Sequence, residues 1–235
     1  MADRFTYLVL DLGILAALGL LVYRRRDLWR MCLKLGIIGG LAGFAGEIFY
    51  FRDYWRPPSS MGIAILSPED FLFGAGIIAL AAVLYPALAG YQLSRGTAKR
   101  RLRQLYILFA LGTATLLIGT LLLEINSILV TSAYFIFALV VMLWQRRDLI
   151  PAATFATLTG VGFITAWYAL LFDKLSPHFW QQHWLLYHTH LGGMILGNIP
   201  LTELLWYTSW IALASVCYPY AEGGVFVRYK KEHAK

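Results

Sequence analysis

Charged residues are scarce in this sequence, and no stretch is polar enough to form a separate soluble domain. Only 14% of its 235 residues are charged, whereas a soluble domain carries about 25%. Hydrophobic residues make up 59%, and the mean hydropathy is +0.63. This composition predicts an all-α integral membrane protein, and the length fits a single transmembrane domain over residues 1–235.

Cysteine is also scarce, and a cleavable targeting signal is not evident. The two cysteines, Cys32 and Cys217, lie in or beside apolar segments, which favours small core residues over a disulfide or a metal site. The start, MADRFTYLVL, lacks a basic region and a small-residue cleavage site. The first apolar segment is therefore expected to be a retained helix.

Apolar segments long enough to cross a bilayer recur along the chain. A spanning helix needs about 20 predominantly apolar residues. The candidates are residues 5–23, 33–51, 71–93, 104–124, 126–144, 151–172 and 199–219. The sequence therefore predicts a seven-transmembrane-helix bundle in which the fourth and fifth helices form a tight hairpin.

The basic residues give this bundle a predicted orientation. Sixteen of the 20 Lys and Arg residues fall in four regions, 24–34, 95–103, 146–147 and 228–235. Basic residues accumulate on the cytoplasmic side of membrane proteins. The distribution predicts an N-terminus outside and a C-terminus in the cytoplasm. It also explains the net charge of +7 by contacts with lipid headgroups, and no nucleic-acid partner is expected.

Tryptophan and tyrosine residues near the predicted span ends fit two interfacial belts. Such rings favour the membrane–water boundary. The expected inner belt contains Trp29 and Trp144, and the expected outer belt contains Tyr54, Trp55, Trp180 and Trp184.

In this orientation, carboxyl side chains collect at the outer end of the bundle, where Glu47, Glu69, Asp70 and Glu203 are the candidate catalytic residues. Ionisable groups within a membrane span are costly and therefore point to function. For Asp70 and Glu203 the alternative is helix capping, because carboxylates also favour helix N-termini.

Glu47 lies near a helix C-terminus, where capping does not explain a carboxylate. It shares a helical face with Gly36, Gly40 and Gly43, and small residues mark close helix contacts in membranes. Glu47 is thus expected to face the bundle interior, where apolar surroundings favour its protonated form.

The last predicted helix carries aromatic residues beside its acid. Trp206, Tyr207 and Trp210 share a face with Glu203. Packing explains such a stripe, but ring faces also stabilise cations. The predicted substrate-binding set consists of Phe73, Trp206, Tyr207, Trp210, Asn198 and Glu124.

A short internal similarity suggests a repeat. Both SPEDFLFG and IPLTELLWY place a proline and an acid at the start of an aromatic-rich helix. Asp70 aligns with Glu203, and Phe73 aligns with Trp206. Helix pair 33–51 and 71–93 would then be related to pair 151–172 and 199–219. Repeated membrane units often place their site between the repeats.

The same motifs carry a resemblance to a known family. The chain resembles the small integral-membrane lycopene (carotenoid) cyclases of the heterodimer type in bacteria and archaea, and more distantly the fungal membrane meroterpenoid cyclases. Those carotenoid cyclases repeat a Pro-x-Glu-Glu or Pro-x-Glu-Asp motif at the start of a helix. Here, Pro68 comes one residue late in the first copy, and Thr202 replaces the first acid in the second.

The resemblance implies a redox-neutral cyclase in the inner (cytoplasmic) membrane that acts on a polyisoprenoid such as lycopene without a cofactor. A carboxylic acid protonates a terminal alkene, a neighbouring double bond captures the cation, and a carboxylate removes a proton. Glu69 or Glu47 is the expected acid, and Glu203 or Asp70 the expected base. The implied partners are the lipid bilayer and either a second cyclase subunit or a second copy of the chain.

Other functions stay open. His183, His188 and His190 could bind a metal, although no metal is expected because no cysteine accompanies them. Intramembrane carboxyls also suit a proton-coupled transporter, and the altered second motif suits a non-catalytic or lipid-binding subunit of a heteromeric cyclase. A retinal-binding protein is excluded because residues 199–219 contain no lysine.

Overall fold

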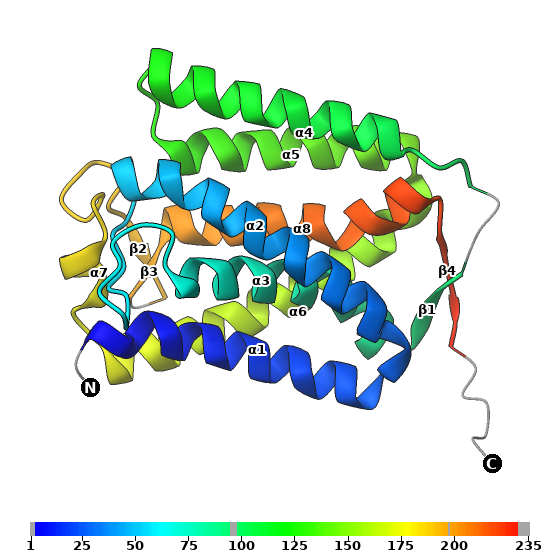
Figure 1. Ribbon diagram of the computed structural model, residues 1–235, viewed down its shortest axis with the longest axis horizontal. Helices are drawn as coiled ribbons and strands as arrows, with labels where there is room; N and C mark the ends of the chain where they lie inside the picture. The colour runs from blue at the N-terminus through cyan, green and yellow to red at the C-terminus, as the bar shows by residue number, and fades with distance from the viewer. Residues whose placement is uncertain (1–2, 95–97, 197, 230–235) are drawn as a thin grey trace.

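Long helices lie side by side in the computed structural model, which describes residues 3–94, 98–196 and 198–229 (Figure 1). The long helices are α1 (Thr6–Arg24), α2 (Trp29–Asp53), α3 (Pro68–Leu88), α4 (Leu102–Leu117), α5 (Ser127–Gln145), α6 (Ile150–Tyr168) and α8 (Leu201–Glu222). The π-helical turns Ile118–Leu122 and Ala169–Leu175 extend α4 and α6. Short 3-10 turns at Asp3–Phe5, Arg26–Leu28 and Arg147–Leu149 precede α1, α2 and α6.

Six helical stretches in the described part of the chain are long and apolar enough to cross a membrane. They correspond to α1 to α6 with their extensions. The prediction of an all-α, multi-pass membrane protein is therefore confirmed at this level. The predicted boundaries lie close to the observed ones, but α3 ends at Leu88 instead of 93 because Gly90, with φ of 72°, turns the chain into a strand.

The two central helices are α3 and α8, which pack against each other and against most of their neighbours. Helix α2 lies very close to α3 because glycines form the contact between them. A Cβ atom on Gly39 would lie 2.4 Å from the Gly74 carbonyl oxygen, and one on Gly43 would lie 2.4 Å from that of Asp70. Small residues thus allow the two backbones to touch, as is common in membrane helix pairs.

One end of the bundle is covered by the segment 54–67 and the described residues of 173–200, which together we call the cap (Figure 1). The cap contains α7 (Phe179–His183) and the paired strands β2 (Met194–Ile195) and β3 (Ile199–Pro200). Its two segments are joined by backbone hydrogen bonds from Arg56 N to His183 O, at 2.8 Å, and from Leu185 N to Tyr54 O, at 2.9 Å.

The prediction of an outer aromatic belt is wrong for the cap residues. Tyr54, Trp55, Trp180 and Trp184 are each at most 5% exposed. They pack inward because the cap closes over the end of the bundle, so their rings cover its interior instead of facing lipid.

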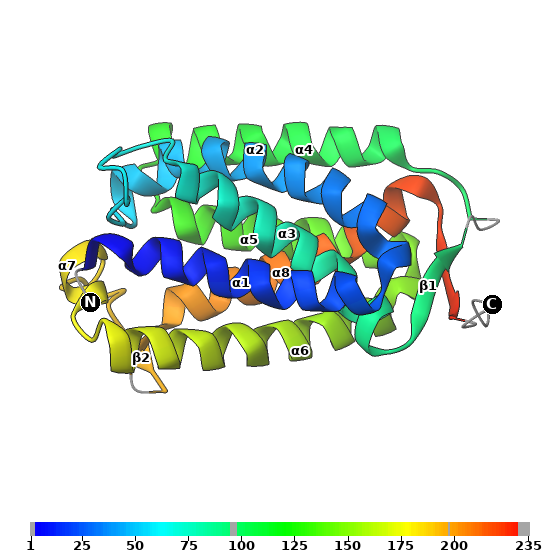
Figure 2. The same cartoon turned by 60° about the horizontal axis from the view of Figure 1, so that its bottom comes forward.

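At the opposite end, the chain leaves α3 and α8 as two strands that pair with each other. Strand β1 (Tyr91–Ser94) runs antiparallel to β4 (Val225–Arg228), with Tyr91 opposite Arg228. We call this end the strand-pair end (Figure 2).

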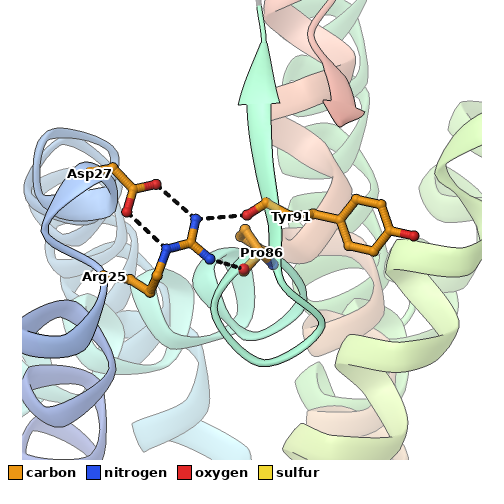
Figure 3. A network of polar contacts seen from close by, with 4 residues as sticks. All are labelled: Arg25, Asp27, Pro86 and Tyr91. Carbon is orange, nitrogen blue, oxygen red and sulfur yellow. Dashed lines mark hydrogen bonds and ion pairs between the residues drawn. The ribbon is translucent and has the colours of Figure 1, made fainter. Parts of the chain in front are cut away.

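A buried arginine fixes the junction of α1, α2 and α3 at the strand-pair end (Figure 3). Arg25 donates two hydrogen bonds to the Asp27 carboxylate, at 2.9 and 2.8 Å. Two further N–H groups donate to the backbone carbonyl oxygens of Pro86 and Tyr91, at 2.5 and 2.7 Å. One planar guanidinium thus joins the end of α1 to the end of α3.

The same contacts recur at the junction of α5, α6 and α8. Arg146 donates to the Asp148 carboxylate at 2.8 and 2.6 Å, and to the carbonyl oxygens of Pro219 and Gly224 at 3.3 and 2.8 Å. Pro219 and Gly224 follow Glu203 by the same numbers of residues as Pro86 and Tyr91 follow Asp70. This duplication supports the predicted repeat, extends it to α1 and α5, and leaves α4 as a helix between two units.

Replacing Arg25 by methionine should lower the free energy of unfolding by about 2 kcal/mol, because Asp27 and two carbonyl groups lose a charged donor. The matched control is Arg24→Met, since Arg24 is an exposed neighbour on the same helix. Thermal unfolding of the purified proteins in one detergent measures the difference. Equal unfolding midpoints for the two variants would contradict a structural role for this arginine.

Candidate functional site

An apolar cavity of about 350 Å³ lies between α2, α3, α4, α5 and α8. Its lining on α5 runs from Ile128 to Met142, and on α8 from Glu203 to Cys217. At 1.5 Å per helical residue, each of these walls is about 20 Å long. The cavity is therefore elongated along the helices and suits a chain-like apolar ligand.

Three carboxyl groups line this cavity near the cap. They belong to Glu47 on α2, Asp70 at the start of α3 and Glu203 at the start of α8. We call this end of the cavity the acid chamber. The sequence places these three side chains at the same end of the bundle, and the structure brings them into one cavity.

Glu47 lines the acid chamber, and only one of its two carboxyl oxygens has a hydrogen-bond partner among the described residues. The indole N–H of Trp55 donates to its Oε2 atom at 3.2 Å. Its Oε1 atom is buried and has no hydrogen-bond partner among the described residues. The glycines that let α2 approach α3 also turn this face of α2 inward, as the sequence predicts for Glu47.

Glu203 is held by two phenols. The Tyr54 hydroxyl donates a short hydrogen bond to Oε1, and the Tyr168 hydroxyl donates to Oε2 at 3.4 Å. Burial, reinforced by the nearby Glu203 charge, raises the pKa of Tyr54 well above its ordinary value, which keeps this phenol a donor. Since phenols occupy both carboxyl oxygens, capping does not account for Glu203.

Asp70 combines a capping role with a place in the cavity. The Ser67 backbone N–H donates to its Oδ2 atom at 2.7 Å, and the Asp70 N–H donates to the Ser67 hydroxyl at 3.3 Å, which completes a capping box. The Tyr7 phenol interacts with this carboxylate and also lines the cavity. Asp70 is therefore positioned by its own helix start while it lines the acid chamber.

Glu69 lies outside the cavity lining. It accepts hydrogen bonds from the Ser59 hydroxyl at 3.1 Å and the Ser60 backbone N–H at 2.7 Å. Both of its oxygens thus tie the cap segment to α3. This placement differs from the sequence-based expectation of a catalytic acid, because the turn before α3 points Asp70 inward and Glu69 toward the loop.

Aromatic rings form the wall around the acids. Phe73 and Trp206 stack with their centroids 6.1 Å apart and an interplanar angle of 11°. Trp210 packs against Trp206 at 5.7 Å, and all three rings line the cavity, as expected for them. Tyr207 instead points toward α6, where its hydroxyl lies 2.7 Å from that of Thr165.

Two further residues of the predicted substrate-binding set also lie outside the cavity lining. The Asn198 side chain donates to the Phe172 carbonyl oxygen at 3.1 Å and so fixes the cap. Glu124 is exposed in the connection between α4 and α5, with φ of 52°. Neither contributes to the acid chamber, because each belongs to a connection at the bundle's surface.

Sequence reasoning misses the cap-side rings Tyr7, Tyr50, Tyr54 and Trp55, all of which line the cavity. It also misses Asp11, a fully buried residue of α1 whose carboxyl oxygens have no hydrogen-bond partner in the described part of the chain. Asp11 could have been found from the sequence, because it is a carboxyl residue inside the apolar segment 5–23. The rings have no comparable signal, because their inward packing depends on contacts between distant segments, such as those of Tyr50 with Thr131 and Trp206.

No protein-family model, curated protein or solved structure matches the chain. Within residues 3–94, 98–196 and 198–229, no group of three or more His, Cys, Asp or Glu side chains is arranged to hold a metal ion.

Replacing Tyr54 by phenylalanine should lower the free energy of unfolding by about 1–3 kcal/mol, because buried Glu203 loses its shorter hydrogen bond. Tyr23→Phe is the control, as Tyr23 is 70% exposed. Thermal unfolding in detergent gives the comparison. A Tyr54→Phe protein as stable as the control would show that the phenol does not hold Glu203.

Proposed function

We propose that this protein is a membrane-embedded, redox-neutral isoprenoid cyclase that protonates a terminal alkene of a polyene such as lycopene. The observation that carries the proposal is Glu47 Oε1, a buried carboxyl oxygen without a partner among the described residues, beside an apolar cavity that also contains Glu203. The motif resemblance at Asp70 and Glu203 supports the same chemistry.

In this proposal α8 is a seventh membrane span, and the protein lies in the inner membrane of the cell. The cap faces outward, and the strand-pair end faces the cytoplasm. The described basic residues of regions 24–34, 98–103 and 146–147 lie at the helix ends near the strand pair, which supports this orientation. Arg95, Lys230, Lys231 and Lys235 also enter the sequence argument but lie outside the described residues.

Glu47 is the proposed acid. An isolated carboxylate in an apolar interior is far costlier than the neutral acid, so Glu47 holds its proton until an alkene is present. The proton of Glu47 adds to the terminal double bond, which leaves a Glu47 carboxylate and a tertiary carbocation. A neighbouring double bond of the same chain attacks this cation, so that one carbon–carbon bond closes the ring.

Glu203 is the proposed base. Its oxygens already act as acceptors for Tyr54 and Tyr168, which suits a group that removes a proton. Loss of a proton from the cyclic cation to Glu203 forms a new double bond. The product is then an isomer of the substrate, and the enzyme resets when a proton passes from Glu203 back to Glu47.

The aromatic wall and Asp70 stabilise the cation between these steps. The ring faces of Phe73, Trp206 and Trp210 attract positive charge without reacting with it. The apolar lining also excludes water, which would otherwise capture the cation as an alcohol. Asp70 adds a fixed acceptor at the edge of the chamber, where its capping bonds hold it away from the acid role.

A second candidate function is binding of a polyisoprenoid by a non-catalytic subunit of a heteromeric cyclase. Thr202, which occupies the position of the first acid in the second motif, favours this alternative. A proton-coupled transporter is less well supported. Toward the strand-pair end, the cavity wall is formed by apolar residues such as Leu108, Met142 and Leu213. These residues provide no polar route from the acid chamber to that end of the bundle.

Replacing Glu47 or Glu203 by glutamine should lower formation of the cyclic product by about 100-fold or more, because each change removes one partner of the proton transfer. The control is Glu124→Gln, since Glu124 is exposed and outside the cavity. The measurement is pigment and terpene analysis of a lycopene-producing bacterial host with matched expression.

A cyclic product that survives both glutamine substitutions would rule out the proposed acid and base. Absence of any cyclic product with the unmodified chain, but co-purification of bound polyene, would favour the non-catalytic subunit.

A further inference from the structure

We propose that the cavity opens sideways into the bilayer between α2 and α4, and that this lateral portal admits one end of a neutral hydrocarbon polyene. The portal rim consists of Ala42 and Ala45 on α2 with Phe109 and Thr113 on α4. The choice of a polyene as the ligand rests on the proposed cyclase function, whereas the portal rests on geometry alone.

The rim residues have two properties that together define an opening. All four line the cavity, and all four are exposed at the surface of the chain. In the described part of the protein, α4 packs against α5 and α8 but has no extensive contact with α2. The cavity wall is therefore incomplete between these two helices, at the level of the apolar part of the bundle.

On the α2 side, the rim of the portal consists of small residues. Ala42 and Ala45 precede Glu47 on the helix, and Gly46 between them and Glu47 also lines the cavity. A larger side chain at these positions would project toward α4. The same α2 segment thus carries the opening and, one residue beyond Gly46, the proposed acid.

The chemistry of the opening excludes a polar ligand head. Ala42, Ala45 and Phe109 are apolar, and the Thr113 hydroxyl donates to the Phe109 carbonyl oxygen of its own helix at 3.0 Å. Among the described residues, no Lys, Arg or His side chain lines the cavity. A diphosphate would therefore meet three carboxyl groups and no cation, so the cavity fits an uncharged hydrocarbon and not a prenyl diphosphate.

The size of the cavity determines how such a substrate binds. A volume of about 350 Å³ is at the low end of ligand cavities, which span roughly 300–1,000 Å³. One terminus of a long polyene fills it, and the rest of the chain stays in the bilayer through the portal. The terminal alkene then reaches the acid chamber while the tail keeps its lipid surroundings.

Photolabelling of the full chain in liposomes tests the portal without any need for turnover. The probe is the apolar photolabel 3-(trifluoromethyl)-3-phenyldiazirine, dissolved in the lipid, and adducts are located by mass spectrometry. We expect adducts on Met142 and Trp210, which line the cavity and are at most 4% exposed, as well as on the exposed Leu122 and Leu158.

Tryptophan at either side of the rim should block entry. Ala45→Trp and, from the opposite helix, Thr113→Trp should each lower adduct formation at Met142 and Trp210 at least fivefold while labelling at Leu122 stays unchanged. The control is Ala110→Trp, because Ala110 is exposed on α4 but lies outside the cavity lining. We call the adducts on Met142 and Trp210 interior adducts. The proposed portal would be overturned if the unmodified protein gave no interior adducts, or if both rim variants gave as many as the control.

Competition identifies the ligand class in the same assay. Excess lycopene should lower the interior adducts at least fivefold, whereas geranylgeranyl diphosphate should leave them unchanged. Equal displacement by both compounds, or by the diphosphate alone, would overturn the preference for a neutral chain, and no displacement by lycopene would overturn the polyene. Interior labelling that depends on the rim, without any cyclic product in the host, would instead contradict the cyclase and leave the portal standing.

Discussion

The close packing of α2 on α3 is the contact on which the acid chamber depends. Gly39 and Gly43 place the backbone of α2 directly against Gly74 and the Asp70 carbonyl group. At this separation, the next inward-facing position on α2 is Glu47, which enters the same cavity as Asp70. Any side chain at these glycines would push the helices apart, and the cavity wall that carries two of the three acids would lose its geometry.

The buried carboxyls differ in how the surrounding structure satisfies them, and this difference suggests their roles. Asp70 is bonded by Ser67, and Glu203 is bonded by two phenols, so both act as hydrogen-bond acceptors. Glu47 receives a single indole bond, and one of its oxygens has no partner in the described residues. In an apolar interior, such an oxygen is costly for a carboxylate but compatible with a neutral acid, which is the form that the proposed protonation of an alkene requires.

Two similar arginine junctions organise the framework, and the differences between the units that they join shape the cavity with the three acids. The two buried arginine junctions place α1, α2 and α3 in one unit and α5, α6 and α8 in another. Tyr168 follows Arg146 by the same number of residues as Glu47 follows Arg25, so the second unit has a phenol where the first has an acid. Helix α4 has no counterpart, and it supplies both the outer cavity wall and one side of the portal.

The sequence by itself determined the membrane class, the approximate extents of the long helices and the presence of acids at one end. Hydropathy and charge distribution are properties of each segment, so they do not depend on how the segments pack. It also marked Glu47 correctly as inward-facing, because the glycine spacing on one helical face is a local pattern.

Only the tertiary structure decided which side chains meet. The turn that starts α3 separates Asp70 from its neighbour Glu69, and the cap brings Tyr54 to Glu203 across most of the chain length. The cap also buries aromatic residues that resemble an interfacial belt in the sequence. Contacts between distant segments have no signature in local periodicity, and therefore the cavity, its portal and the partners of each acid emerge only when the helices are packed.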